Sequence, residues 1–525
     1  MSLKILILLL FFIITLSVGI VCRRSTKDVD GFVLGSRNVG SWLTAFAYGT
    51  SYFSAVIFVG YAGQFGWKYG IASTWIGLGN AFLGSLLAWV VLGRRTRLMT
   101  QHLNSATMPE FFGKRYLSSS LKIAASVVIF IFLIPYTASL YNGLSRLFGM
   151  AFNIDYEWCV ISMAILTAAY VILGGYMAAA VNDFIQGVIM LVGIVAVIFA
   201  VLNSHGGFLN ALNDLSKINC EESLNLQGAF VSFFGPNPLE LLGVVILTSL
   251  GTWGLPQMVG KFYAITNERA IAKGTAISTF FAIIVAGGCY FLGGFGRLYS
   301  NNIDYVTNGK PIYDSIIPSM LSGLPDILLG IVVILVLSAS MSTLSSLVIT
   351  SGSTLTLDII APFFKARNKE LGTSGKLFTI RFLVVFFIII SSVIAIIQAK
   401  SSVTFIAQLM GISWGALAGA FLAPLIYGLY WKKTTALSVW ICFISGVGIM
   451  CADMYCRSIN QIFITPFLTS PINAGVLAML IGLIIVPIVS LFTPKLNNQI
   501  VDKMFLCYER TVVVHASTAL ADSEN

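Results

Sequence analysis

Long apolar runs separated by polar segments dominate the hydropathy pattern of this chain. Many runs reach the roughly 20 residues that an α-helix needs to cross about 30 Å of hydrocarbon. A transmembrane β-barrel would instead show alternating segments of about 10 residues. The pattern therefore predicts an all-α polytopic membrane protein with about thirteen transmembrane helices. Their expected positions are 3–22, 41–64, 70–93, 121–147, 157–176, 183–202, 238–263, 274–296, 325–358, 377–398, 402–430, 435–453 and 471–492.

Composition and charge support the same class. Of the 525 residues, 57% are hydrophobic and only 10% are charged, whereas a soluble domain carries about 25% charged residues. The net charge of +10 does not indicate nucleic-acid binding, because the basic residues lie in the segments between apolar runs. If the N-terminus is outside, 23 of the 31 Lys and Arg residues, Lys261 among them, fall in inward segments. We therefore expect a multi-pass protein of the cell (inner) membrane with a cytoplasmic C-terminus.

Two of the expected helices are interrupted by small and polar residues. The second contains Gly49, Ser51 and Gly60, and the seventh contains the segment 248–256 with two glycines and a proline. The two helices lie five spans apart. Interrupted helices at matching positions of two halves indicate a transporter built from inverted repeats. Glycine that merely permits close helix packing is the alternative.

The ninth expected helix carries a face of hydroxyl groups. Ser342, Ser345 and Ser346 stand at i, i+3 and i+4, and Thr343 is rotated toward a neighbouring face. Oxygen ligands of this kind suit a weakly bound hard cation. In the alternative interpretation these hydroxyls bond back to their own helix. Ionisable residues are nearly absent from the expected helices, and no acid, base, nucleophile or metal cluster predicts an enzyme.

Several other residues within the expected helices are candidates for binding. Asp183 begins the sixth expected helix, where it is a candidate helix cap and a candidate cation ligand. Side chains with an aromatic ring or a hydroxyl suit contact with a small amphipathic solute, or they serve packing alone. They are Tyr52, Ser54, Tyr136, Thr252, Trp253 and Trp414. The sequence leaves open whether Cys451 and Cys456 pair.

Four motifs, in order along the chain, resemble those of the sodium:solute symporter family. Residues 30–37 resemble the loop before its first core helix, and residues 107–112 resemble its T-x-P-[DE] loop. Gly174-Gly175 with Asp183 and Gln186 fits its G-G-x₇-D-x-x-Q pattern, and residues 341–345 fit its sodium-site helix. The resemblance covers nearly the whole chain.

The resemblance implies the leucine-transporter fold, in which two inverted five-helix repeats are flanked by peripheral helices. The implied segments are a first helix with its loop, the first repeat, an extracytoplasmic loop, the second repeat, two C-terminal helices and a cytoplasmic tail, at 1–40, 41–202, 203–237, 238–430, 431–492 and 493–525. The resemblance also implies one or two coupling Na⁺ ions. One would bind Ser342, Thr343 and the carbonyls of Thr50, Phe53 and Ala339, and the other would bind Asp183, Ser342, Ser345 and Ser346.

The implied activity is sodium-coupled import of a small organic solute by alternating access. Proline symporters have an aspartate where this chain has Tyr52, whereas Tyr52-x-Ser54-Ala55 resembles the pantothenate branch. Trp414-Gly415-Ala416 resembles the proline branch. An amino acid such as proline, pantothenate and another small carboxylate therefore all stay open as solutes. The alternatives are an ion channel or a membrane sensor on the same scaffold. We expect a functional monomer whose partners are the solute, sodium and the lipid bilayer.

Overall fold

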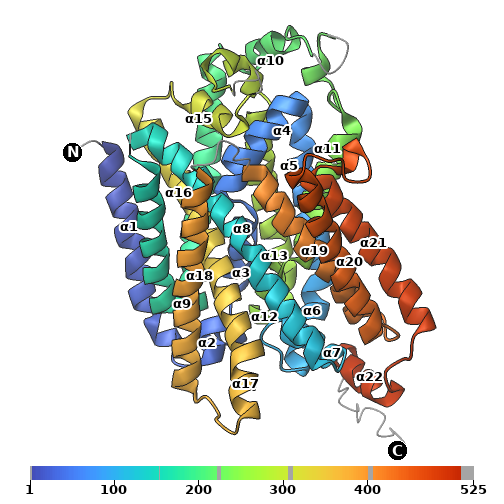
Figure 1. The fold of residues 1–525 in the computed structure, drawn as a ribbon. Helices are drawn as coiled ribbons and strands as arrows, with labels where there is room; N and C mark the ends of the chain where they lie inside the picture. Colours follow the sequence, from blue (N-terminus) through green and yellow to red (C-terminus); the bar gives the residue numbers. More distant parts are fainter. Residues whose placement is uncertain (1–2, 153, 221–225, 306–310, 400–405, 510–525) are drawn as a thin grey trace, which may run out of the picture.

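The computed structural model describes residues 3–152, 154–220, 226–305, 311–399 and 406–509 (Figure 1). Within these ranges the chain forms helices and three isolated β-bridges. The first-half helices are α1 (Leu3–Val21), α2 (Val29–Leu34), α3 (Ser41–Tyr52), α4 (Ala62–Tyr69), α5 (Thr74–Gly79), α6 (Arg94–His102), α7 (Met108–Arg115), α8 (Ser119–Phe152), α9 (Tyr156–Ser204), α10 (Phe208–Ser216) and α11 (Pro238–Leu250). Those of the second half are α12 (Pro256–Ala264), α13 (Glu268–Ala282), α14 (Gly288–Gly293), α15 (Ile316–Leu321), α16 (Asp326–Leu355), α17 (Ala361–Ala366), α18 (Thr373–Ala399), α19 (Ile406–Tyr430), α20 (Ala436–Ser458), α21 (Pro471–Phe492) and α22 (Asn498–Phe505). Four 3₁₀ or π segments are used below, namely η3 (Val56–Tyr61), η5 (Asn80–Leu87), η9 (Gly251–Gly254) and η13 (Thr356–Ile360).

Ten helical stretches in the described part of the chain are long and apolar enough to cross a membrane, and the bent pair of α11 and α12 makes eleven. The all-α membrane class is confirmed, but the predicted count of thirteen is not. The difference arises because two of the ten stretches, Val56–His102 and Tyr156–Ser204, run for 47 and 49 residues, more than twice the length of one crossing. Each contains a glycine with positive φ, Gly70 at 61° and Gly175 at 52°, and such a residue interrupts the helix.

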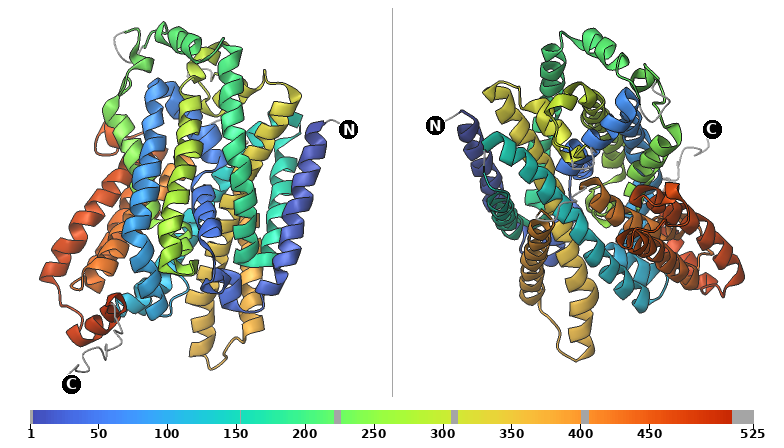
Figure 2. Two further views of the ribbon diagram at one scale, coloured as in Figure 1. Left: turned by 180° about the vertical axis from the view of Figure 1, so that it is seen from behind. Right: turned by 45° about the horizontal axis from the view of Figure 1, so that its top comes forward.

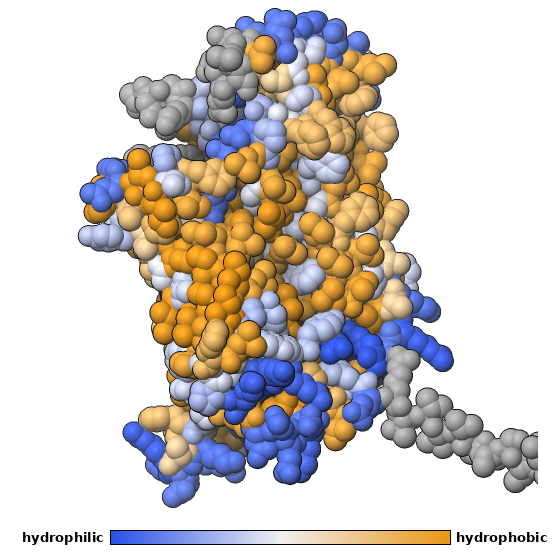
Figure 3. All heavy atoms as spheres, turned by 90° about the vertical axis from the view of Figure 1, so that its right-hand side faces the viewer, coloured by the Kyte–Doolittle hydropathy of each residue, from blue (hydrophilic) through white to orange (hydrophobic). Residues whose placement is uncertain are grey.

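The bundle has a buried centre and exposed flanks. In the stretch that contains α16, 83% of the most apolar window is buried, compared with 17% for α1. The central helix α16 packs against α8, α9 and α18, while α20 and α21 pack on the buried helix α19 from the edge opposite α1 (Figures 1 and 2). Apolar side chains cover the middle of the surface, and hydrophilic ones gather toward its two ends (Figure 3). This band is the surface expected of a protein embedded in a bilayer.

The two ends of the bundle differ in what they carry. The start of α1 lies at the same end as α10 and α15, and α7, α17 and α22 lie at the opposite end (Figure 1). A chain whose ends emerge on opposite sides crosses the membrane an odd number of times. The C-terminal part of the expected tail, 510–525, lies outside the described residues. Cys451 and Cys456 are both thiols in α20.

The two interrupted helices are present, and they break in the same way. Helix α3 ends at Tyr52, Phe53 is extended at φ −91° and ψ 124°, and the helix resumes at η3. Helix α11 continues into η9, Leu255 is extended at φ −83° and ψ 122°, and α12 follows with a bend of 48°. The near-equal dihedral angles put one extended residue at the centre of each interrupted helix. The predicted boundaries of the repeats, 41–202 and 238–430, stay a prediction.

Candidate functional site

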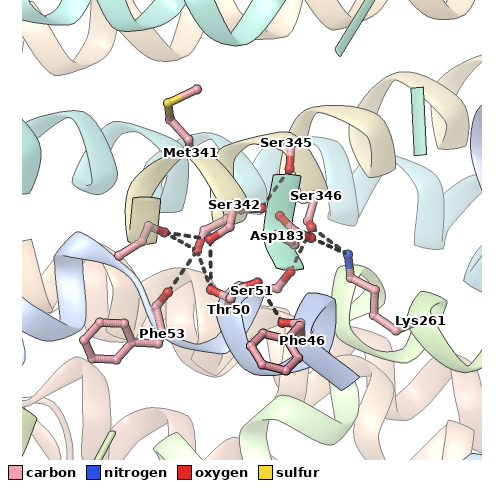
Figure 4. Close-up of polar contacts among 12 residues, drawn as sticks. Phe46, Thr50, Ser51, Phe53, Asp183, Lys261, Met341, Ser342, Ser345 and Ser346 are labelled. Carbon is pink, nitrogen blue, oxygen red and sulfur yellow. Dashed lines mark hydrogen bonds and ion pairs between the residues drawn. The ribbon is translucent and has the colours of Figure 1, made fainter. Parts of the chain in front are cut away.

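Five oxygen atoms meet where the break after α3 touches α16 (Figure 4). The hydroxyls of Ser342 and Thr343 each lie 3.1 Å from the carbonyl oxygen of Ala339. They also lie 3.1 and 3.4 Å from the carbonyl oxygen of Thr50, and Thr343 lies 3.5 Å from that of Phe53. All five residues are buried. The structure thus brings together the whole residue set that the sequence associates with the first cation.

Local structure explains why these carbonyls are available. A helix leaves its last four carbonyl groups without an intrahelical partner. Thr50 belongs to the last turn of α3, and the extended backbone of Phe53 separates that turn from η3. The hydroxyls of Ser342 and Thr343 on α16 contact these free carbonyl groups. Their small side chains also let the backbones of α3 and α16 approach closely. The break in α3 therefore creates the acceptors, and α16 supplies two further oxygens.

The five-oxygen cluster fits a sodium ion. Oxygens held at about 2.4 Å by a hard cation the size of Ca²⁺, which Na⁺ matches closely, lie about 3.4 Å from their neighbours. The measured spacings of 3.1 to 3.5 Å therefore suit such an ion with little rearrangement. None of the five groups carries a charge. Neutral oxygens favour a weakly held ion that can be released again.

The expected ligands of the second cation surround a lysine ammonium (Figure 4). Lys261 Nζ donates to Ser346 Oγ over 2.9 Å and lies 3.7 Å from Asp183 Oδ2. Ser346 Oγ also lies 2.9 Å from Ser51 Oγ on α3. Ser345 Oγ instead donates to the Ser342 carbonyl over 2.8 Å. The side chains of Lys261 and Asp183 are only 3% and 1% exposed, so this ion pair lies inside the bundle.

Three expectations about charged residues need correction. Lys261 lies in α12 inside the protein rather than in an inward loop. Asp183 lies well inside α9, eight residues beyond the break at Gly175, so the helix-cap alternative is wrong. The expected helices also hold more ionisable groups than the sequence suggested, because Asp358 is buried in η13 and accepts a hydrogen bond from Thr107 over 2.6 Å. The burial of Lys261 could have been predicted from the sequence, because this residue lies inside the expected helix 238–263.

The end of α12 is fastened to the loop before α3. The amide of Val39 donates to the Ala264 carbonyl over 3.1 Å, and Val39 in turn accepts from the amide of Thr266 over 3.1 Å. Arg37 donates to the carbonyl of Ser105 over 2.6 Å and to that of Tyr263 over 3.4 Å. Burial lowers the pKa of the Arg37 guanidinium, and nearby Asp30 opposes this shift. These contacts, which we name the α12 tie, hold together elements from both predicted repeats.

A cavity of about 50 Å³ lies between the α12 tie and the Asp183–Lys261 pair. Lys261 and Ser346 form part of its wall, together with Tyr176, Gln257 and Thr107. Its other lining residues extend along α16 as far as Thr354 and include Leu34 of α2 and Met108 of α7. The cavity therefore runs from the ion pair toward the end of the bundle that carries α2 and α7.

The predicted solute residues fall into two groups. Trp414 joins Tyr52 and Tyr136, with ring centroids 6.1 and 5.9 Å away. The hydroxyl of Tyr136, Nε1 of Trp414 and Oγ of Ser54 are buried without a hydrogen-bond partner among the described residues. The second group is tied to η5, because Trp253 Nε1 donates to the carbonyl of Leu83 over 3.0 Å and Thr252 Oγ1 lies 3.5 Å from that of Gly84.

The tyrosine in the first group is also tied to the second interrupted helix. The hydroxyl of Tyr52 donates to the Thr248 carbonyl over 2.6 Å. Tyr52 therefore joins α3 to α11 through its only polar atom. The hydroxyl of Tyr136 faces the polar atoms of Ser54 and Trp414, so these three groups form one buried cluster of candidate ligand contacts.

Known proteins resemble this chain over most of its length. The osmoregulated proline transporter OpuE of Bacillus subtilis is 28% identical over 439 residues, which cover 82% of this chain and 85% of the relative. The sodium/proline symporter of Escherichia coli is 27% identical and covers 80% and 81%. A sodium/proline symporter of Staphylococcus saprophyticus is 28% identical and covers 87% and 88%.

Solved structures show the same fold. A Na⁺-coupled sialic acid symporter in an outward-open state matches with a TM-score of 0.74 at 15% identity, covering 94% of this chain and 99% of that one. A nucleobase-cation-symport-1 family transporter matches with a TM-score of 0.50 at 12% identity, covering 90% and 98%. The leucine-transporter-like architecture is thereby confirmed. Because the sequence model of the sodium:solute symporter family matches residues 32–446, the chain belongs to that family and is a sodium-coupled symporter of a small organic solute rather than an enzyme.

Proposed function

We propose that this symporter imports a small amino acid, with proline as the first candidate, together with sodium bound at the five-oxygen cluster of α3 and α16. The carrying observation is the convergence of Ser342 and Thr343 with the carbonyls of the broken helix at 3.1 to 3.5 Å. A break in a helix supplies carbonyls for an ion near the bundle centre. An ion there joins α3 to α16 and so orders the break beside which the solute binds.

The solute is assigned from the buried aromatic group of Tyr136 and Trp414 and from the relatives. Tyr136 and Trp414 offer apolar rings together with a hydroxyl and an indole N–H that lack partners among the described residues. Such groups suit a small amphipathic molecule whose carboxylate accepts hydrogen bonds. The three relatives named above by sequence are a proline transporter and two sodium/proline symporters. Tyr52, which replaces the aspartate of proline symporters, uses its hydroxyl on the Thr248 carbonyl, so this departure does not place a new polar group before the solute.

We further propose the orientation in which α1 begins outside and α22 lies in the cytoplasm. The end with α10 carries the long loops, and the opposite end carries α7, α17 and α22, each with a basic residue in its last turn, as the positive-inside rule requires. In this orientation the α12 tie closes the cytoplasmic end of the pathway. Alternating access then requires the tie to open for release. Because one chain supplies every residue of both clusters, a monomer suffices.

Uptake into proteoliposomes tests this function. Purified protein should accumulate labelled proline only when sodium is present outside, and collapse of the sodium gradient should abolish accumulation. Pantothenate and other small carboxylates are compared in the same assay as competitors. Uptake that is equal in sodium and in potassium would overturn sodium coupling. Strong competition by pantothenate with none by proline would move the solute assignment to that branch.

A further inference from the structure

The Asp183–Lys261 pair occupies the place that the sequence associates with a second sodium ion. Of the four expected ligands, Ser346 accepts a hydrogen bond from Lys261 Nζ, and the Asp183 carboxylate is 3.7 Å from it. The other two are turned elsewhere, since Ser342 belongs to the five-oxygen cluster and Ser345 donates back to its own helix. We propose that the ammonium of Lys261 is a tethered cation that takes the place of a second sodium ion, so that one sodium ion accompanies each solute.

The charges at this position support the assignment. Neither carboxylate oxygen of Asp183 has a hydrogen-bond partner among the described residues, so the nearby ammonium is what balances the buried negative charge. A buried carboxylate without a counter-charge is strongly unfavourable. Lysine and sodium both carry one positive charge, and a single carboxylate balances only one of them. A sodium ion added beside Lys261 would leave an excess positive charge in the bundle.

Coordination at this position is also satisfied by the lysine. Lys261 Nζ donates to Ser346, whose hydroxyl also meets Ser51 of the broken helix α3 at 2.9 Å. The ammonium lies 5.2 Å from the ring centre of Tyr176, a distance at which the face of an aromatic ring attracts a cation. The surroundings therefore recognise a cation through an oxygen, a carboxylate and an aromatic face.

The tether distinguishes this cation from a coupling ion. Lys261 belongs to α12, which follows the break of the second interrupted helix, whereas Asp183 and Ser346 belong to α9 and α16. A sodium ion bound beside the cavity could dissociate during each transport cycle. The ammonium of Lys261 cannot dissociate, because it is covalently attached to α12. The position thus contributes a fixed charge to the bundle and adds no charge to the transport cycle.

The experiment compares Lys261→Met with wild type and with Lys432→Met, which removes a lysine from the exposed pair with Asp502. Sodium-22 bound per purified protein is counted at equilibrium without solute, and sodium taken up per solute is counted in proteoliposomes. Wild type and Lys432→Met should bind and transport one ion. Lys261→Met should bind two, because Asp183 and Ser346 then face an open position. Each added charge raises the attainable solute gradient roughly 50-fold per 100 mV.

Two further variants sharpen the outcome. The double change Asp183→Asn with Lys261→Met removes both charges and should return the count to one ion, and Lys261→Arg should keep it at one. Two ions bound by wild type, or one ion bound by a folded Lys261→Met, would overturn the proposal. If Lys261→Met does not fold, the wild-type count and the double variant still decide. The inference rests on the proposed function. A failure of the proposed function can be told apart from a failure of this inference, because wild type would then show no sodium-dependent uptake.

Discussion

Two oxygen-rich clusters lie one helical turn apart on α16, yet their chemistry differs. The cluster at Ser342 and Thr343 is neutral and meets the carbonyls of a broken helix. The cluster at Ser346 contains a carboxylate and an ammonium from two other helices. The sequence pattern predicted a cation at each of them. On the two proposals above, serine and threonine spacing locates a cation position, whereas the residues that pack against it decide whether an ion or a side chain fills it.

The largest expected effect tests the neutral cluster. Changing Ser342 and Thr343 together to Ala removes two of five oxygens, each worth about 1.5–3 kcal/mol when it contacts a charged group. Half-maximal uptake should then need at least about 100-fold more sodium. Ser340→Ala is the matched control, because its hydroxyl bonds back to the Val336 carbonyl of the same helix over 2.8 Å. Wild-type sodium dependence in the double variant would place the site elsewhere.

The next effect tests the charged cluster through protein stability. Asp183→Asn leaves the buried ammonium of Lys261 without a counter-charge, and breaking a buried pair in this way costs about 3–5 kcal/mol. We expect a marked fall in thermal stability in detergent. Adding Lys261→Met should restore part of it, because the double variant buries no charge. The exposed pair of Lys432 and Asp502 provides the contrast, and Asp502→Asn should change the stability by less than about 1 kcal/mol. An equal response at the two pairs would contradict the buried charge.

The sequence predicted the architecture well for physical reasons. Apolar runs of about 20 residues are required for helices in a bilayer, so the all-α membrane class could be predicted from length and hydropathy alone. The two interrupted helices were found because glycine, proline and hydroxyl residues weaken a helix, and the breaks at Phe53 and Leu255 fall inside the expected segments. The number of membrane crossings was harder to predict. A turn at a single glycine such as Gly175 barely interrupts the helix, so two crossings can follow each other within one long helical stretch.

The site was predicted only in part. Ser342 and Thr343 stand next to each other on one helix, so local spacing made them candidates, whereas their role as ligands was implied by the family resemblance and stays a prediction. Lys261 was missed because a lysine close to the end of an apolar segment has the pattern of an interfacial residue whose charge reaches water. Its burial depends on α9 and α16, which are far away in sequence. A long-range ion pair leaves no periodic signal along the chain.

A third effect distinguishes the proposed solute contacts from the two cation positions. Tyr136→Phe removes a hydroxyl that has no partner among the described residues, so the protein itself should lose little stability. The bound solute should lose one hydrogen bond of about 1 kcal/mol or slightly more. The Michaelis constant for solute should rise about tenfold while the sodium dependence stays unchanged. Thr137→Ala on the same helix, whose hydroxyl donates to the Leu133 carbonyl, should have no such effect. A matching shift in the control would assign the change to packing.

The smallest expected effect concerns Tyr52, which the sequence grouped with Tyr136. Its hydroxyl already donates to the Thr248 carbonyl over 2.6 Å and so links α3 to α11. Tyr52→Phe keeps the ring beside Trp414 and removes only this link, which is worth about 0.5–1.5 kcal/mol to stability. The Michaelis constant for solute should therefore change less than about threefold, in contrast to Tyr136→Phe. A larger change than that of Tyr136→Phe would mean that the Tyr52 hydroxyl turns from Thr248 to the solute during transport. The link between the interrupted helices would then be a contact that the solute replaces.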